Sequence, residues 1–284
     1  MARRAHVTQR YCFWSAATGP YSLMLQSAVD SARAVGVFKD FHVWSDRRID
    51  GAVTHPLKKM DAPHGLFRLL LLTKEVRKLK YDYLIWLDAD THFVRNPGDA
   101  LRVLQGAPVH ATLECDAAAG PHLQPDWQRC SLANFTKLMR FAGVRSRSIF
   151  TTDAGFWIVH REAAEHFCRL AWDFGDFCHR VGYRFGFEPL LAYATQILCG
   201  NPYAHRLEES SDLWGVDRQG YFDGRIPDGR SWPHLDFFTG KHRKVNPAIV
   251  HARHSRQVLA ARGRSRIGRG PLIPARNSRS HAGV

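Results

Sequence analysis

Apolar residues recur along this chain with two different periods, and the alternation between them predicts an α/β protein. Short apolar runs at 11–15 and 41–44 flank a segment, 21–36, whose apolar residues fall on one face of a helix. Such a β-α-β order favours a parallel sheet. The same alternation predicts further helices at 66–80, 132–141, 162–177 and 188–198, and further strands at 83–87, 109–114, 156–159, 206–213 and 248–251.

The run at 83–87, Tyr-Leu-Ile-Trp-Leu, is apolar at every position. Continuous apolar runs are typical of central strands that are covered on both faces. We therefore expect this strand to lie in the middle of the sheet. It ends at Asp88, where polar residues begin.

The apolar periodicity also indicates the domain boundaries. It is absent from residues 1–9, expected to be a loose N-terminus, and it ends at about Ala261, after which Gly, Pro, Arg and Ser dominate. The interval 10–261 fits one large α/β domain, because such domains extend to roughly 250 residues. Residues 262–284 are expected to form a basic, disordered tail. The stretch 217–246 is rich in Gly, Pro and aromatic residues, so we expect a long functional loop there.

Composition agrees with a folded protein that has an anionic partner. Hydrophobic residues make up 45% and charged residues 23% of the chain, which is ordinary for a folded soluble domain. The net charge is +14. The six arginines of the tail contribute +6 of this charge, which leaves about +8 on the domain. A basic domain suits a nucleotide diphosphate, an anionic lipid surface or a nucleic acid, and charge alone does not choose among them.

The six cysteines include no C-x-x-C pair, so they indicate neither a zinc motif nor a dense disulfide scaffold. We expect reduced, mostly buried thiols, which are typical of cytosolic proteins. The basic N-terminus lacks the apolar core of a secretory signal, and no window of about 18 residues is apolar throughout. A cytoplasmic protein is expected, and its basic tail is a candidate for contact with an anionic membrane surface at the cytoplasmic face.

Two carboxylates follow the central strand directly. Asp88 and Asp90 stand where residues 83–87 leave the sheet, and ligands of open α/β sheets bind outside the carboxyl ends of the strands. Mg²⁺ or Mn²⁺ suits two such oxygen ligands, because these ions are held by one or two carboxylates together with substrate phosphates. The alternative is that the pair only caps a turn, but like charges close to a buried strand are costly without a cation.

A second alternative is a phosphatase of the haloacid-dehalogenase type, in which a strand also ends in D-x-D. Those enzymes expect Thr or Val four residues after the first Asp, where this chain has His92; Thr91 comes one residue too early. Their motif usually opens the domain, whereas here a full β-α-β unit comes first.

The strand with its Asp-Ala-Asp triplet, followed by Phe-Val-x-Asn-Pro, resembles the DxD region of GT-A glycosyltransferases, most closely the family 8 type and its bacterial relatives. The resemblance covers roughly residues 10–255. It implies a GT-A, Rossmann-like fold with a mixed, mostly parallel sheet flanked by helices. It also implies metal-dependent transfer of a sugar, of the hexosyltransferase type, from a nucleotide-sugar. A UDP-sugar is the expected donor, and the acceptor is a glycan, a lipid or a protein.

The resemblance assigns donor-binding roles to five further positions. Ser15, Thr18 and Tyr21 lie in the first loop, where such enzymes bind the nucleotide, although an ordinary strand-to-helix turn explains them equally well. Arg68 lies in the Arg-Leu-Leu helix before the DxD strand and would face the diphosphate, for which its forked donors are suited. Lys74 is a weaker candidate further along the same helix.

The remaining assignments concern the sugar and the third metal ligand. Asp153 stands where the family usually has Asn in the segment that contacts the donor sugar, and Gly155 there allows close backbone approach. His251 matches the His of the late strand that completes the metal site, although the family's usual H-x-x-G-x-x-K-P-W continuation is absent. Glu188 would face the reacting sugar, as a base or as a stabiliser of positive charge, or else is a helix-start acid.

Two other classes remain open from the sequence. The charge favours a nucleic-acid-binding protein, but no recognition helix or RNP-type motif accompanies it, so no specific nucleic acid is expected. A non-catalytic relative that only binds a nucleotide is the other alternative. The presence of Asp88, Asp90 and His251 argues against it.

Overall fold

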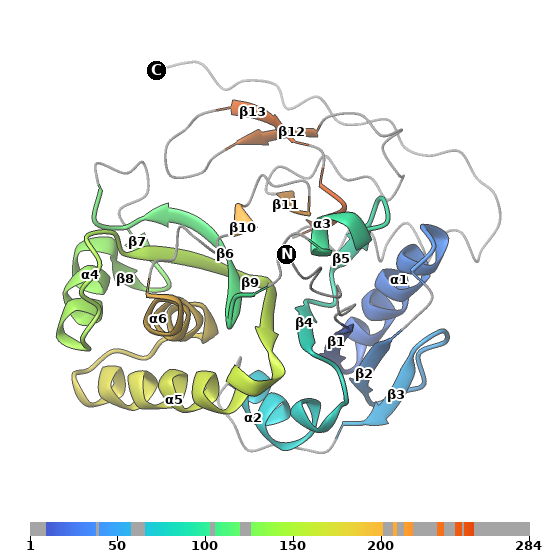
Figure 1. Cartoon of the computed structure of the whole chain (residues 1–284), viewed down its shortest axis with the longest axis horizontal. Coiled ribbons are helices and arrows are strands. Elements are labelled where there is room, and N and C mark those ends of the chain that lie inside the picture. Colours follow the sequence, from blue (N-terminus) through green and yellow to red (C-terminus); the bar gives the residue numbers. More distant parts are fainter. Residues whose placement is uncertain are drawn as a thin grey trace, which may run out of the picture.

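A seven-stranded mixed sheet forms the centre of the structure, which is a computed structural model (Figure 1). The structure describes residues 10–37, 40–57, 66–102, 106–119, 126–200, 207–208, 213–217, 232–235, 242–245 and 247–252. The strand order is β10-β6-β9-β4-β1-β2-β3. Its strands are β1 (Tyr11–Ala17), β2 (Phe41–Ser45), β3 (Val53–Pro56), β4 (Tyr83–Leu87), β6 (Val109–Asp116), β9 (Phe150–His160) and β10 (Leu207–Glu208).

Parallel pairing dominates the sheet, which confirms the predicted fold class. The pairs β4–β1, β1–β2, β2–β3 and β10–β6 are parallel, whereas β9 runs antiparallel to both of its neighbours, β4 and β6. Strand β4 has the bounds predicted from its apolar run, lies between β1 and β9, and is buried at every position. The central strand therefore delivers Asp88 to the carboxyl edge of the sheet.

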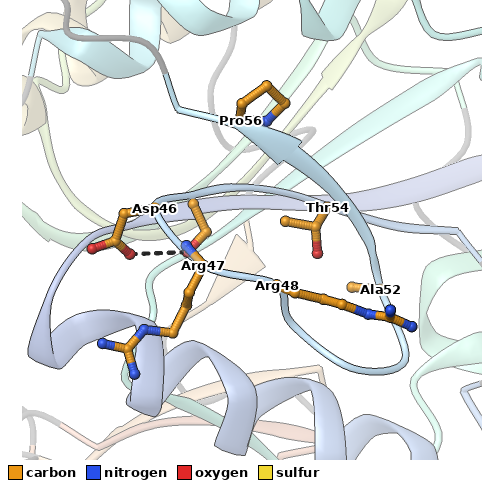
Figure 2. Close-up of a pocket in the computed structure, with 7 residues that line it drawn as sticks. Asp46, Arg47, Arg48, Ala52, Thr54 and Pro56 are labelled. Carbon is orange, nitrogen blue, oxygen red and sulfur yellow. Dashed lines mark hydrogen bonds between the residues drawn. The ribbon is translucent and has the colours of Figure 1, made fainter.

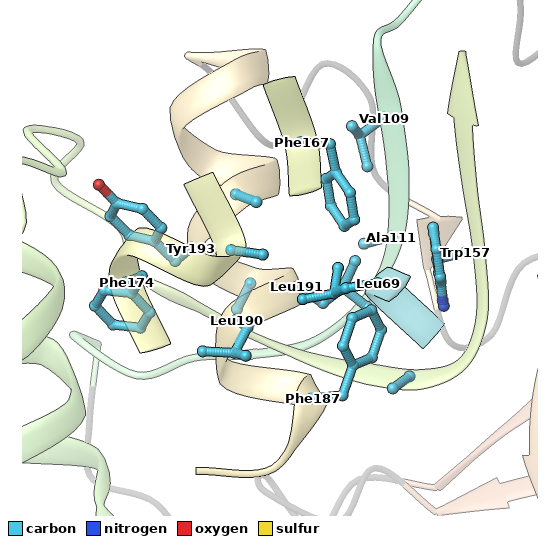
Figure 3. Close-up of a cluster of buried hydrophobic side chains, with 14 of the residues drawn as sticks. Leu69, Val109, Ala111, Trp157, Phe167, Phe174, Phe187, Leu190, Leu191 and Tyr193 are labelled. Atoms are coloured by element: carbon cyan, nitrogen blue, oxygen red, sulfur yellow. The ribbon is translucent and has the colours of Figure 1, made fainter. Parts of the chain in front are cut away.

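Side chains of the central strands point alternately to the two faces of the sheet, and each face packs into its own apolar core. On one face, Trp86 and Trp157 pack with residues of four helices, and Figure 3 shows part of this core. On the other face, Ile85 and Ile158 pack against Leu25 and other residues of the first helix. The helices are α1 (Pro20–Ala34) on the second face, and α2 (Phe67–Lys74), α4 (Leu132–Phe141), α5 (Ala164–Arg180) and α6 (Phe187–Cys199) on the first.

Short elements complete the described part of the chain. A three-stranded sheet with the order β11-β14-β5 adjoins the end of β4. Its strands are β5 (Thr91–Phe93), β11 (Trp214–Asp217) and β14 (Ile249–Ala252). The others are α3 (Gly98–Arg102), the 3-10 helices η1 (Val76–Lys78) and η2 (Arg161–Ala163), and the pairs β7 (Asp126–Trp127) with β8 (Cys130–Ser131) and β12 (Trp232–Leu235) with β13 (His242–Val245).

Four predicted elements differ from the structure. The helix expected at 66–80 ends at Lys74 and is followed by η1, while β9 is much longer than the predicted 156–159. The stretch 217–246 was expected to be a loop, but it contains the antiparallel pair β12–β13. Of the strand expected at 206–213, residues 207–208 form β10 and 213 is not in a strand, while 206 and 209–212 lie outside the described residues.

The expectation of free thiols is confirmed. All six cysteines are free, and four of them are buried. Burial is also the largest factor raising the pKa of the Cys178 thiol to about 12. No helix among the described residues is both long and apolar enough to cross a membrane. The predicted loose N-terminus and the basic tail, 262–284, lie outside the described residues.

Candidate functional site

Asp88, Asp90 and His251 meet at the carboxyl end of β4, as the sequence predicts. One ligand atom of each residue lies within 4.8 Å of the other two. The small sheet explains this convergence: β5 begins directly after Asp90, and β14 pairs antiparallel to β5 with His251 opposite Thr91. A residue about 160 positions away is thereby brought to the two aspartates.

The imidazole of His251 points its Nε2 atom at both carboxylates. Nε2 lies 3.1 Å from Oδ1 of Asp90 and 3.9 Å from Oδ2 of Asp88. The side chain of His251 is only 8% exposed, whereas each aspartate side chain is 21% exposed. The Asp88–Asp90–His251 cluster is therefore buried on the histidine side and open to solvent through its carboxylates.

The second oxygen of Asp88 is held by two donors from the protein. Arg68 donates to Oδ1 from Nη2 at 2.7 Å, and the indole Nε1–H of Trp86 donates to the same oxygen at 2.8 Å. The backbone N–H of Asp88 donates to the carbonyl oxygen of Gly155 at 2.9 Å. These bonds fix the carboxylate so that Oδ2 remains directed at the cluster.

Aromatic rings surround the Arg68 guanidinium. Its Cζ lies 4.7 Å from the ring centroid of Trp86, 5.4 Å from that of Phe187 and 6.0 Å from that of Phe67. Such contacts favour a cation because the face of an aromatic ring is negative. Arg68 was expected to face the diphosphate; in the structure it is bound to Asp88, and its role toward the diphosphate stays a prediction.

Buried charges shift the protonation of the cluster. Burial raises the pKa of Asp88 against the opposing effect of Arg68. Burial alone would lower the pKa of His251, but Asp90 and Asp153 together raise it well above its ordinary value. Burial acts to raise the pKa of Asp90 too, yet His251 outweighs it and the pKa is lowered. A proton on His251 thus offsets the carboxylate charges, and a cation that binds Nε2 must displace it.

The residues of the cluster fit a divalent cation of the Mg²⁺ or Mn²⁺ type. Two carboxylates and one imidazole converge, carboxylate oxygens suit both ions, and an imidazole adds a ligand suited to transition metals. Further ligands would have to come from solvent or substrate, since three protein groups do not fill an octahedral shell. The convergence of a buried imidazole and two carboxylates on one position therefore supports the prediction that these three residues form a metal site.

Asp153 and Gly155 lie behind this cluster on β9. The side chain of Asp153 is fully buried, and its Oδ1 lies 3.4 Å from Nδ1 of His251. The backbone N–H of Gly155 donates to the same oxygen at 2.7 Å. The sequence predicted that these residues contact a donor sugar; in the structure both face His251.

The first-loop residues lie at the same carboxyl edge of the sheet. Ser15 is buried, and its hydroxyl donates to the carbonyl oxygen of Leu87 at 2.6 Å, joining β1 to β4. Thr18 is exposed, and its carbonyl accepts from the N–H of Tyr21, whose side chain is 61% exposed. Lys74 is exposed at the opposite end of α2 from Arg68. Of these, only Thr18 and Tyr21 present side chains that a ligand can reach from this edge.

Glu188 lies at the start of α6, directly after Phe187, whose ring contacts Arg68. Its Oε2 accepts a hydrogen bond from Nε2 of Gln128, a residue with a φ of 52° in the turn between β7 and β8. Gln128 and the next residue, Arg129, both have a positive φ, which is the geometry that a two-residue type I′ hairpin turn requires. Glu188 is half-buried, and its neighbour in the chain, Phe187, contacts the Arg68 guanidinium.

Sequence reasoning missed two residues of the site, Trp86 and Gln128. For Trp86 a signal existed, because residues two apart in a strand point to the same face and Trp86 is two positions before Asp88. For Gln128 there was none, because its contact with Glu188 joins two segments 60 positions apart. The sequence alone identified the three members of the Asp88–Asp90–His251 cluster better than the groups that orient them.

Arg68→Lys is expected to lower the free energy of unfolding by about 1.5–3 kcal/mol, the range for a hydrogen bond to a charged group. An ammonium cannot reproduce the planar fork that reaches Asp88 and the carbonyl of Ala154. The matched control is Arg77→Lys, whose partner Glu165 is 70% exposed, so a change within about 0.5 kcal/mol is expected. Urea unfolding of the two variants measures both; equal losses would contradict a special role for Arg68.

Comparison with known proteins establishes the fold. No family model matches the chain, and no curated protein matches it significantly. Among solved structures, the apo structure of the bifunctional glycosyltransferase WbbM matches with a TM-score of 0.53 and 11% identity over 89% of this chain and 47% of that chain. Mouse xyloside xylosyltransferase 1 in its apo form matches with a TM-score of 0.52 and 13% identity over 86% of this chain and 97% of that chain.

This chain spans about half the length of WbbM and nearly the full length of the xylosyltransferase. At identities this low the likeness concerns the fold alone. The fold is the α/β fold of GT-A-type glycosyltransferases, with a central mixed sheet flanked by helices, as the sequence predicts.

Proposed function

We propose that this chain is a metal-dependent glycosyltransferase that moves a sugar from a nucleotide-sugar to a glycan, lipid or protein acceptor. The observation that carries the proposal is the Asp88–Asp90–His251 cluster at the carboxyl end of the central strand. In open α/β sheets ligands bind at this edge. The solved structures with the same fold are glycosyltransferases by name, which supports the reaction class.

Asp88, Asp90 and His251 would hold Mn²⁺ or Mg²⁺, which when bound offsets the negative charge of the departing diphosphate. Arg68 and Trp86 keep one oxygen of Asp88 occupied, and so present the other to the site. In this proposal Arg68 serves the diphosphate by fixing Asp88. Glu188 faces the sugar, either as a base or as a stabiliser of positive charge in the transition state.

A cavity near the ends of β2 and β3 is proposed to receive the nucleoside (Figure 2). It has a volume of about 540 Å³. Because β1, β2, β3 and β4 are parallel, the part of the cavity at Ser45, Asp46 and Pro56 lies at the same edge of the sheet as the cluster, whereas Ala52 and Thr54 line it from the start of β3. Neighbouring strands are about 4.8 Å apart, so the two strand steps from β4 to β2 span roughly 10 Å. The cavity is lined by Ser45, Asp46, Arg47, Arg48, Ala52, Thr54 and Pro56.

Asp46 lines this proposed nucleoside cavity and is hydrogen-bonded to the first loop and the start of α1. Its carboxylate accepts from the backbone N–H of Gly19 at 2.8 Å and from the hydroxyl of Ser22 at 2.7 Å. The hydrogen bond from Gly19 is the largest cause of its lowered pKa. Asp46 thus fixes the loop that carries Thr18 and Tyr21, the residues proposed to contact the nucleotide. A uracil base is the expected occupant.

The test is thermal unfolding with UDP, GDP, CMP or ADP, each with and without Mn²⁺. A ligand that binds only the folded state stabilises it by RT ln(1 + [L]/Kd), about 2.7 kcal/mol at a hundredfold excess over Kd. We expect UDP to raise the melting temperature, and to do so only with Mn²⁺. Stabilisation by another nucleotide would change the donor, while none by any nucleotide would overturn the proposal and favour a nucleic-acid-binding protein.

A further inference from the structure

The carboxylate of Asp153 is buried directly behind His251, on the side away from Asp88 and Asp90. The side chain of Asp153 has no exposed surface, and that of His251 is 8% exposed. Nδ1 of His251 is fully buried and makes no hydrogen bond within the described part of the chain, while Oδ1 of Asp153 lies 3.4 Å from it, within ion-pair distance. Nε2 points the other way, at the two aspartates. The imidazole thus stands between a buried carboxylate and the candidate cation site.

A register shift in β9 places Asp153 at this position. On its β6 edge, β9 pairs Trp157 with Ala111 but Asp153 with Thr112, so three residues of β9 are additional. Bulges of this kind re-aim side chains and occur often beside active sites. On its other edge the same stretch stays bound to the central strand, because the carbonyl of Gly155 accepts from the N–H of Asp88.

Gly155 leaves the space through which Asp153 and His251 meet. A Cβ atom at position 155 would lie 2.6 Å from Nδ1 of His251 and 2.8 Å from Oδ1 of Asp153. The backbone N–H of Gly155 also donates to that oxygen at 2.7 Å. This hydrogen bond orients the carboxylate of Asp153. It also supplies one of the donors that a buried carboxylate requires.

We propose that Asp153 is a positioning residue for the candidate metal site: it accepts the Nδ1 proton of His251 and so directs the Nε2 lone pair at the cation. The tautomer of a metal-binding histidine is set by the hydrogen bond of its other ring nitrogen. A carboxylate in that role fixes the orientation of the ring and raises the basicity of the ligand. The proposal rests on the proposed function, because it presumes that the cluster holds a cation.

Asp153→Asn tests the carboxylate with little change of shape. Mn²⁺ is titrated into the protein without any nucleotide, and free Mn²⁺ is followed by electron paramagnetic resonance. We expect the affinity to fall 10- to 100-fold, the usual effect of removing such a partner. Asp173→Asn, on the exposed surface of α5, is the matched control and is expected to bind Mn²⁺ as the wild type does.

Two outcomes would overturn the proposal in distinguishable ways. If Asp153→Asn binds Mn²⁺ within twofold of the wild type while KM for the donor rises, Asp153 contacts the sugar and the positioning role is wrong. If the wild type itself binds no Mn²⁺, the proposed function fails together with the inference.

A measurement on the wild type removes the dependence on a variant that folds. In the Mg²⁺-loaded protein with ¹⁵N-labelled histidine, we expect the His251 proton to reside on Nδ1, with the signal assigned by His251→Gln. A proton on Nε2 in the loaded protein would overturn the proposal.

Discussion

Asp90→Ala is expected to reduce turnover on the order of 10³-fold or more and to leave the metal-free protein folded. Asp90 supplies one of the two carboxylates of the cluster, and its Oδ1 lies 3.1 Å from the third ligand, His251. Cation stabilisation of a leaving group contributes several kcal/mol, and about 4 kcal/mol corresponds to 10³ in rate. Release of UDP from a UDP-sugar with excess Mn²⁺ measures the loss.

The fold should survive this change because Asp90 contributes little to the core. Its side chain is 21% exposed and belongs to neither apolar core, so the change removes its contact with His251 and no core packing. Circular dichroism of the metal-free variant checks this expectation. Asp126→Ala, at an exposed position of β7, is the control and should retain full turnover. Normal turnover by Asp90→Ala would show that the cluster is not the metal site.

Local sequence patterns predicted the elements that position the site. The apolar run 83–87 matched β4 in both bounds, and 132–141 matched α4, because each pattern is local and unbroken. Asp88 and Asp90 were recognised because two acidic residues follow a strand that is buried on both faces. The sequence therefore predicted the strand, and the end of it, at which the Asp88–Asp90–His251 cluster lies.

The predicted bounds of helices and strands were wrong where the apolar pattern continued across a break in the helix, or where the strand contained buried polar residues. The helix expected at 66–80 ends at Lys74, yet Val76 still packs in the core, so the apolar spacing continues across the break. The early part of β9 was missed because Thr151, Thr152 and Asp153 are polar but fully buried. Burial of polar side chains depends on partners that are distant in the sequence, and no local period reports it.

The orienting contacts of the site were beyond the sequence for the same reason. Arg68 was recognised as a phosphate-binding type of residue, but its bond to Asp88 depends on how α2 packs beside β4. Asp153 was recognised as a carboxylate near the sugar, but the shifted register of β9 turns it toward His251. Residue type suggested a ligand for each side chain, whereas tertiary packing decides which protein groups that side chain contacts.

Gly155→Ala is expected to lower Mn²⁺ affinity at least tenfold and the free energy of unfolding by about 1–3 kcal/mol, the usual cost of overpacking. The new Cβ would lie 2.6 Å from Nδ1 and 2.7 Å from Cε1 of His251, closer than side chains tolerate. The ring must move, since the backbone of Gly155 is tied to Asp88 and to Asp153. A displaced ring no longer presents Nε2 to the two aspartates.

Gly175→Ala separates this local effect from a general effect of adding a methyl group. At position 175, inside α5, the new Cβ would lie 3.5 Å from Leu190, an ordinary contact. Alanine is favoured over glycine in a helix interior by about 1 kcal/mol, so this variant should be as stable as the wild type or more so, with unchanged Mn²⁺ affinity. If Gly155→Ala binds Mn²⁺ as well as Gly175→Ala does, the orientation of His251 does not govern the site. If it loses the cation but stays folded, the space at Gly155 is required for binding the metal rather than for folding.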